Sequence, residues 1–225
     1  MNKHISQQYD AELDRARSLL LEMGGLVEQQ LQHSCQSLYS HDLALAEKTS
    51  SSDTKINQME LTIDNLCTSI IARRQPAATD LRMLISIMKA STDLERIGDE
   101  AKRIAKFVRN VANLTQPTHQ YSNIRRMAEL VQTMLARVLD AFARLSADNA
   151  LAVIEADHEV DAAYYQIMRE MGAQMHAEPQ HIDELLTVLW AARSLERCGD
   201  HTKNLAEFVV YLVRGKDVRH SQTSS

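Results

Sequence analysis

Two pairs of carboxylates carry the clearest chemistry in this sequence. Glu95 and Asp99 lie four residues apart, and Glu196 and Asp200 repeat that spacing about a hundred residues later. On a helix, residues four apart lie one above the other, so each pair offers two adjacent oxygen donors. Such donors suit hard cations such as Mg²⁺, Ca²⁺, Mn²⁺ or iron. The pattern favours a metal site, although a solvated acidic face is the commoner role of a single pair.

The two pairs differ one helical turn further along. Arg103 follows Asp99 by four residues and is placed to pair with it, whereas Asn204 holds the equivalent place after Asp200. Because no arginine offsets the second pair from there, we expect a divalent or trivalent cation (Mg, Mn, Fe or Zn) to prefer the C-terminal site. Glu196 and Asp200 would be its ligands, with Asn204 as a third oxygen donor. His201 is a weaker candidate for an extra ligand.

Each pair belongs to a longer stretch that occurs twice, at residues 94–108 and 195–209. Nine of the fifteen aligned positions are identical, which indicates two copies of one structural unit. In both copies apolar residues recur at alternating steps of three and four, so each stretch predicts a helix with one buried seam. The carboxylates fall on the flank or outside of that helix, and Gly98 and Gly199 recur on its seam side, where we expect a close helix approach.

The elements around these stretches are also predicted to be helical. Only 6 Gly and 3 Pro interrupt the 225 residues and aromatics make up 4%, a composition that favours helices over strands. Apolar periodicity predicts an all-α chain of two tandem antiparallel three-helix bundles, elongated in shape. We expect the N-terminal helices over 8–39, 42–74 and 80–113, two helices that replay the first two at an offset of 104, and a last helix over 182–213.

Local signals refine these boundaries. Thr79 is the predicted N-cap of the third helix, and Gly215 the αL residue that ends the last. Gly24-Gly25 predicts a close helix crossing or a bend, and Thr49–Ser52 a fray or kink. Thr115–Gln120 is the expected boundary, which divides the chain into bundles 1–116 and 117–225. The last residues, 216–225, are expected to be loosely held.

Composition excludes several functional classes. A formal charge of -5 without a polybasic segment argues against nucleic acid and against direct adhesion to anionic lipid. No apolar run approaches the roughly 20 residues that span a bilayer, so any work at a membrane would go through a protein partner. Cys35, Cys67 and Cys198 fall in apolar helical patterns, which indicates buried thiols in a reducing, cytoplasmic setting. Phosphate loops, nucleophile elbows and di-iron signatures are missing, so we expect no enzyme activity.

The repeated stretches also resemble the PhoU family of bacterial phosphate-specific transport accessory proteins. The resemblance rests on Leu94–Asp99 and Leu195–Asp200, the paired signature of that family, and it extends over nearly the whole chain. Further matching stretches are Met23–Glu28, Arg73–Pro76 with Asp80–Arg82, Asp140–Arg144 and Lys216–His220. Metal binding at Glu-x-x-x-Asp motifs is a family property. By position it falls on Glu95, Asp99, Glu196 and Asp200; Asn204 fits the family pattern and Arg103 departs from it.

What the resemblance implies is a negative regulator of phosphate uptake and of the phosphate-starvation regulon. Such a protein links the ATPase subunit of the phosphate ABC transporter to the PAS region of its sensor histidine kinase, at the inner membrane only through these partners. We also expect a homodimer. Two alternatives stay open at this point: a metal-binding structural or dimerisation protein, and a carboxylate-bridged metalloenzyme.

Overall fold

The computed structural model describes residues 2–111 and 121–216, and within them it leaves the side chains of residues 2–6, 52–53, 110–111 and 121 undescribed. Every regular element in these ranges is helical, which confirms the all-α prediction. The elements are α1 (Asn2–Ser40), α2 (Leu43–Arg74), α3 (Ala78–Val111), α4 (Tyr121–Arg144), α5 (Ala147–Ala177), the short 3-10 turn η1 (Pro179–His181) and α6 (Ile182–Arg214).

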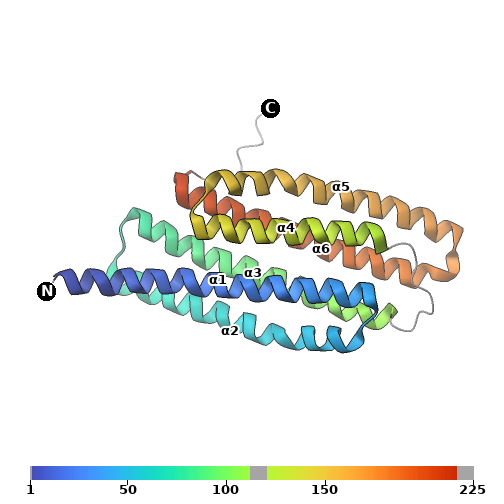
Figure 1. Ribbon diagram of the computed structural model, residues 1–225, viewed down its shortest axis with the longest axis horizontal. Coiled ribbons are helices and arrows are strands. Elements are labelled where there is room, and N and C mark those ends of the chain that lie inside the picture. The colour runs from blue at the N-terminus through green and yellow to red at the C-terminus, as the bar shows by residue number, and fades with distance from the viewer. Residues whose placement is uncertain (1, 112–120, 217–225) are drawn as a thin grey trace.

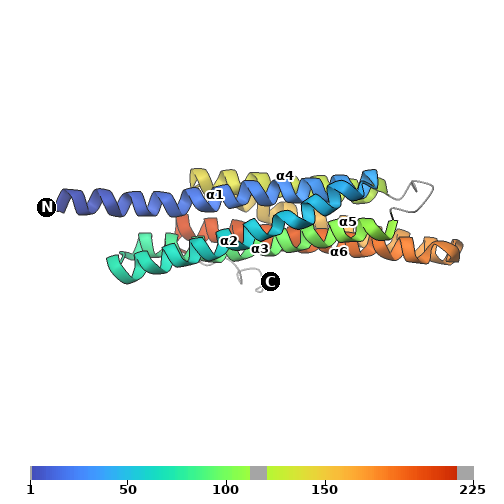
Figure 2. The same ribbon diagram turned by 90° about the horizontal axis from the view of Figure 1, so that it is seen from below.

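The six helices form two antiparallel three-helix bundles, α1–α3 and α4–α6, as the repeat predicts (Figure 1). The bundles lie side by side and staggered along a common long direction, so the molecule is elongated (Figure 2). They meet through two helix pairs, α3 against α6 and α1 against α4. The repeated stretches therefore lie on the two helices that join the bundles.

The predicted seams form the cores of the bundles. Leu94 and Ile97 of α3 are completely buried, as are Leu195 and Cys198 of α6 to within 1%. Burying a side chain of this size stabilises the fold by about 2 kcal/mol. Because both copies bury the same positions, the repeat in sequence is a repeat in packing.

Helix ends follow the local signals with two exceptions. Gly215 ends α6 at φ 66°, as predicted. Asp42, for which no cap was predicted, caps α2 by accepting from the Leu45 amide. The Thr79 prediction is wrong, because α3 already begins at Ala78 and the Leu81 amide bonds to the Ala77 carbonyl. Helix α1 begins at Asn2, six residues before the predicted start, because the polar N-terminal residues extend the helix without an apolar periodicity to reveal it.

The predicted weak point in α2 is also absent, since the helix runs unbroken through residues 49–52. The hydroxyls of Thr49 and Ser51 bond back to the carbonyls of Leu45 and Lys48, which lets hydroxyl residues stay inside a helix. The predicted boundary at 115–120 and the end of the third helix at 113 lie outside the described residues, as does all but the first residue of the C-terminal segment.

Close packing explains the glycines that lie inside helices. A Cβ at Gly24 would lie 2.5 Å from Leu139 Cδ2 of α4, so α1 and α4 cross closely there, whereas Gly25 has nothing within 4 Å. At Gly98 the nearest atom is Ile56 Cδ1 at 3.3 Å, and at Gly199 it is Val160 Cγ1 at 3.2 Å. The signature glycines therefore allow α2 and α5 to approach α3 and α6, as their position on the seam side predicts.

Candidate functional site

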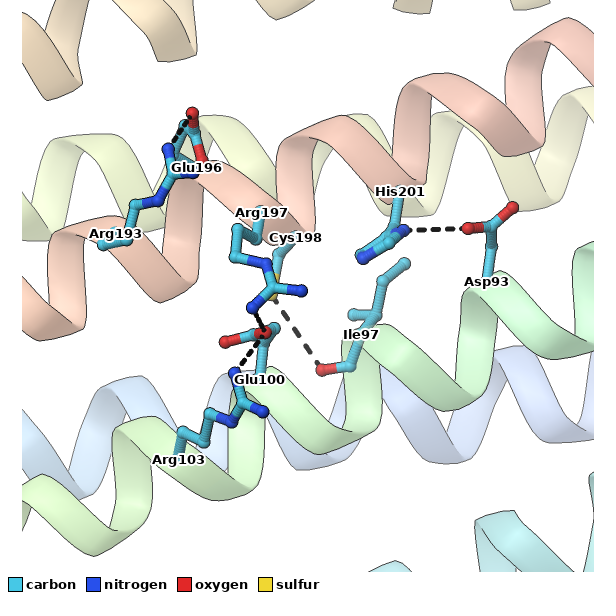
Figure 3. Close-up of polar contacts among 9 residues, drawn as sticks. All are labelled: Asp93, Ile97, Glu100, Arg103, Arg193, Glu196, Arg197, Cys198 and His201. Carbon is cyan, nitrogen blue, oxygen red and sulfur yellow. Dashed lines mark hydrogen bonds and ion pairs between the residues drawn. The ribbon is translucent and has the colours of Figure 1, made fainter.

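The two signatures face each other where the bundles meet (Figure 3). Helices α3 and α6 cross antiparallel, and the Cys198 thiol lies 3.9 Å from the Ile97 carbonyl oxygen. Ile97 and Cys198 are the same position of the repeat, so the approximate twofold relation between the bundles passes between them. Residues one turn away on either side form the polar contacts of this junction.

Glu100 is the centre of one set of contacts. Its side chain is 4% exposed, and its Oε1 accepts from Arg197 of α6 at 2.8 Å and from Arg103 of α3 at 2.9 Å. The sequence-based pairing of Arg103 with Asp99 is therefore wrong. Arg103 pairs with Glu100 instead, because Glu100 is buried at the junction and also accepts from a guanidinium of the other bundle. Asp99 lies on the flank, away from that second guanidinium.

Asp93 is the centre of a second set of contacts at the same junction. Its Oδ1 lies 2.8 Å from His201 Nδ1 and accepts from Asn204 Nδ2 at 3.3 Å. Two residues that the sequence offers as metal ligands thus turn toward α3 and join the bundles. In Figure 3 His201 points at Asp93 and away from Glu196.

Glu196 and Asp200 lie on the other flank of α6, beside α5. Glu196 is more shielded than its predicted outward position implies, since its side chain is 13% exposed. The charge of Asp161 on α5 acts on it. Its Oε1 accepts from Arg193 at 2.6 Å, while the buried Oε2 has no hydrogen-bond partner among the described residues. Burial, followed by the charges of Asp200 and Asp161, raises the pKa of the Glu196 carboxyl.

Helix α5 brings two further carboxylates that the sequence analysis missed. Asp157 and Asp161 are again four apart, and their charges, after burial, raise the pKa of Asp200. The signal that could have revealed them was the same acidic i, i+4 spacing on the preceding helix. One cation is already in place, since Lys203 Nζ lies 2.9 Å from Asp157 Oδ2.

The corresponding flank of the first bundle differs at the repeat position of Asp161. Glu95 and Asp99 lie half-buried on α3, and α2 presents Asn57 at the repeat position that Asp161 holds in α5. The Asn57 Oδ1 is buried without a hydrogen-bond partner among the described residues. A neutral amide therefore stands beside the first pair where a carboxylate stands beside the second.

The C-terminal flank fits a hard cation by its chemistry. Its carboxylates are crowded and partly buried, so their negative charges repel one another. A bound cation would offset this repulsion. Within residues 2–111 and 121–216, however, no three His, Cys, Asp or Glu side chains converge as a metal-binding group. Binding would therefore require the carboxylates of α5 and α6 to turn toward one another.

The three cysteines are not in an environment that would make their thiols reactive. All three are buried and unpaired as disulfides, and burial raises the pKa of Cys35 and of Cys67 to about 12. Their thiols are protonated at neutral pH and act as small apolar side chains of the core.

The fold and the paired signatures define a class of helical protein built from two homologous bundles, and comparison with known proteins identifies the family. The PhoU domain model matches residues 20–108 and 124–209. A Pseudomonas aeruginosa "phosphate-specific transport system accessory protein PhoU homolog" is 48% identical over 98% of this chain and 91% of its own length. The Escherichia coli K12 protein named PhoU is 40% identical, with the same coverage of both chains.

Solved structures agree with these sequence matches. The crystal structure of PhoU from Pseudomonas aeruginosa aligns with a TM-score of 0.90 at 47% identity, covering 92% of this chain and 100% of that one. The PhoU structure from Streptococcus pneumoniae aligns with a TM-score of 0.86 at 32% identity, covering 93% and 99%. The chain belongs to the PhoU family. No helix in its described residues is long and apolar enough to cross a membrane.

Proposed function

We propose that this chain is an accessory protein of phosphate transport and the negative regulator of the phosphate-starvation genes. It acts without catalysis, as an adaptor between the ATPase subunit of the phosphate ABC transporter and the PAS region of the sensor histidine kinase. The observation that carries the first part is the likeness to relatives named as phosphate-specific transport accessory proteins, which extends over 98% of the chain.

The structure supports an adaptor by its shape. Two bundles are joined side by side through α3 and α6, which leaves an outer face on each bundle. The faces differ in their side chains, since α5 carries Asp161 where α2 carries Asn57. The junction is held by contacts to two buried carboxylates, Glu100 with Arg197 and Asp93 with His201, so the two faces keep a fixed relation to each other. A rigid body with two unlike faces suits the linking of two different proteins.

Deletion of the gene tests the regulatory role. A reporter driven by a phosphate-repressible promoter should stay on at high phosphate in the deletion strain and be repressed again when the unmodified chain is supplied. Normal repression in the deletion strain would count decisively against this function. The adaptor role requires in addition that the purified chain bind the purified ATPase subunit and the purified PAS region.

Metal binding at the C-terminal flank is a second proposal, favoured by the crowded carboxylates of α5 and α6. Calorimetric titration of Mn²⁺ should show that Glu196→Gln/Asp200→Asn loses at least tenfold in affinity, a change of about 1.4 kcal/mol. The matched change Glu95→Gln/Asp99→Asn should lose less. Lys203→Gln should bind more tightly, because it removes the ammonium next to Asp157.

Equal losses in both double variants would refute the preference for the C-terminal bundle, and no binding to the unmodified chain would remove the metal site. Because the bundle cores rest on apolar seams, removing the metal should leave the circular dichroism spectrum unchanged. The expected homodimer also stays a prediction, which sedimentation velocity can test.

A further inference from the structure

Five large apolar side chains are exposed at one end of the α5–α6 hairpin. They make up most of the eight large hydrophobic residues that are exposed in the described parts of the chain. We call them the tip patch: Tyr165 and Met168 of α5, with Ile182, Leu186 and Trp190 of α6. In Figure 1 this end is the orange tip where η1 joins the two helices. Tyr165 is 66% exposed and Trp190 59%, unusual values for aromatic side chains.

The tip patch lies on one side of the hairpin. On α6 its residues are four apart, and on α5 they are three apart, so each helix contributes a single stripe. The register between the helices is fixed by Arg193, whose guanidinium lies 5.9 Å from the Tyr164 ring, and by the Lys203–Asp157 pair. The same antiparallel register places Met168 level with the turn of α6 that carries Trp190.

The stripe of the tip patch continues into the acidic flank. Glu196 and Asp200 lie fourteen residues after Ile182 and Leu186, and on α5 Asp161 lies seven residues before Met168. Steps of seven return to the same side of a helix, so Ile182, Leu186 and Met168 share one face with the carboxylates. Trp190 is in step with Arg197, which contacts Glu100, and therefore lies at the edge of this face nearer α3. Fourteen residues of helix span roughly 20 Å. The hairpin therefore presents an apolar anchor region and a group of carboxylates about four turns away.

The charges of this face specify what can cover it. This flank holds four carboxylates against the two cations Arg193 and Lys203, so negative charge is in excess; the carboxylates are those of Asp157, Asp161, Glu196 and Asp200. Tyr, Trp and Met are the side chains that interface cores favour. A complementary surface has apolar side chains for the tip patch and, about 20 Å further along, arginine or lysine for the carboxylates.

The first bundle shows that the tip patch does not follow from the fold alone. At its repeat positions stand Leu61, Asp64, Leu81, Ile85 and Lys89. Of these only Leu61 is a large exposed hydrophobic residue, at 62%. Where the second bundle has Met168 and Trp190, the first has the charged residues Asp64 and Lys89, which are readily hydrated. The two hairpins share one backbone plan but differ in what they can bind.

We infer that the outer face of the α5–α6 hairpin docks a partner protein through an amphipathic helix, with apolar residues on the tip patch and basic residues on Asp161, Glu196 and Asp200. This inference rests on the proposed adaptor function, and it assigns one of the two partner surfaces to the second bundle. The partner is recognised by its apolar and basic pattern, and anchoring of this kind fixes orientation as well as affinity.

The chain carries a direct probe of this docking, because Trp190 is its only tryptophan. Incorporation of 5-fluorotryptophan gives a single fluorine resonance from within the tip patch. The unlabelled ATPase subunit and the unlabelled PAS region, both purified from the same organism, are titrated separately into the labelled full chain. We expect the resonance to shift and broaden with at least one of them, and iodide quenching of Trp190 emission to fall.

Variants then separate this surface from the rest of the molecule. Tyr165→Ala/Trp190→Ala should weaken binding of that partner at least tenfold, as measured by calorimetry on unlabelled protein. The matched control is Leu61→Ala/Lys89→Ala, the same two repeat positions in the first bundle, which should change affinity less than twofold. Because Glu196 and Asp200 are also the proposed metal ligands, the charge test uses metal-free protein, in which Glu196→Gln/Asp200→Asn should flatten the salt dependence of binding. All these positions are at least partly exposed, so the substitutions should not disturb the core. Circular dichroism of each variant is the control for folding.

The outcomes distinguish the two proposals. If neither purified protein binds the unmodified chain, the adaptor function fails, and the docking inference with it. If one binds but Trp190 does not respond and both double variants bind equally, the adaptor function stands and the docking inference is wrong. A resonance that shifts with the concentration of the chain alone, or with anionic vesicles alone, would assign the tip patch to a second copy or to lipid and overturn it as well.

Discussion

The first and second bundles carry the same Leu-Glu-Arg-x-Gly-Asp stretch on their third helix, but the helix beside that stretch differs. In the second bundle α5 brings Asp157 and Asp161 to the carboxylates, and in the first α2 brings Asn57 to the position of Asp161. The buried seams of both copies are alike. The comparison teaches that packing positions of the repeat were kept while its exposed flanks took on different charges, so the two halves have one fold and separate surfaces.

A similar contrast exists at the junction itself. Glu100 and His201 hold the same repeat position, yet Glu100 accepts from two arginines and His201 pairs with Asp93. The backbones of the two helices therefore follow the approximate twofold relation, while the side chains at equivalent positions form different contacts. Three predictions use these contrasts, beginning with the largest expected effect.

The first prediction compares His201→Ala with Glu100→Ala. Removing His201 leaves the Asp93 carboxylate, which is 8% exposed, with only the long bond from Asn204, and we expect a loss of about 3 kcal/mol in the free energy of unfolding. Removing Glu100 leaves Arg103 and Arg197, which are 52% and 42% exposed and remain hydrated, so a loss of about 1 kcal/mol is expected.

Urea unfolding followed by circular dichroism at pH 7 measures both losses. His158→Ala, at an exposed position of α5, is the control and should change stability by less than about 0.5 kcal/mol. Losses of equal size would contradict this argument, which rests on the burial of the partner left behind: Asp93 is buried, whereas Arg103 and Arg197 are exposed.

The second prediction compares Gly199→Ala with Gly98→Ala. Alanine gains about 1 kcal/mol over glycine in a helix, but at both sites its Cβ meets a neighbouring helix. Near Gly98 the neighbour is the flexible end of Ile56, which can rotate away. Near Gly199 it is a branch of Val160, whose χ1 is stiff. We expect Gly98→Ala to be nearly neutral and Gly199→Ala to lose about 1 kcal/mol.

Thermal unfolding of both variants checks this order. Gly25→Ala, where the added Cβ meets nothing within 4 Å, serves as the reference and should stabilise the protein by about 0.5–1 kcal/mol. The argument from side-chain stiffness is contradicted if Gly98→Ala is the more damaging change.

The third and smallest prediction concerns pH. Folding raises the pKa of Asp200 above its ordinary value of 3.8, so the folded state binds this proton more tightly than the unfolded state. The contribution is present below pH 3.8 and is lost as pH rises through the raised pKa. At neutral pH the charge is therefore unfavourable, and Asp200→Asn should stabilise the protein by less than about 1 kcal/mol, since the side chain is exposed to solvent.

The measurement is the difference in unfolding free energy between Asp200→Asn and the unmodified chain from pH 3 to pH 8, which should grow as pH rises. Asp99→Asn is the matched change in the first bundle and should give a smaller difference, because Asn57 is neutral where Asp161 is charged. If the difference in unfolding free energy did not change with pH, the charge of Asp200 would not destabilise the folded state, and the explanation by crowded carboxylates would be wrong.

Much of the fold could be predicted from the sequence because helical signals are local. The spacing of Leu94, Ile97 and Val108 identifies a buried seam without knowledge of any neighbour, and the repeat at residues 195–209 shows that the chain uses it twice. Gly215 marks a helix end because only its own backbone conformation is involved. The carboxylates Glu95, Asp99, Glu196 and Asp200 could be placed on helix flanks for the same reason.

The side-chain partners could not be predicted, because they depend on how helices rotate and slide against one another. Arg103 has two acids within reach on its own helix, and the choice of Glu100 follows from Arg197, which lies on α6. The tertiary structure alone brings Asp157 beside Lys203 and turns His201 toward Asp93. Helix periodicity fixes which face is buried, whereas long-range packing fixes which residue lies opposite, and the surfaces that differ between the two bundles are set by that packing.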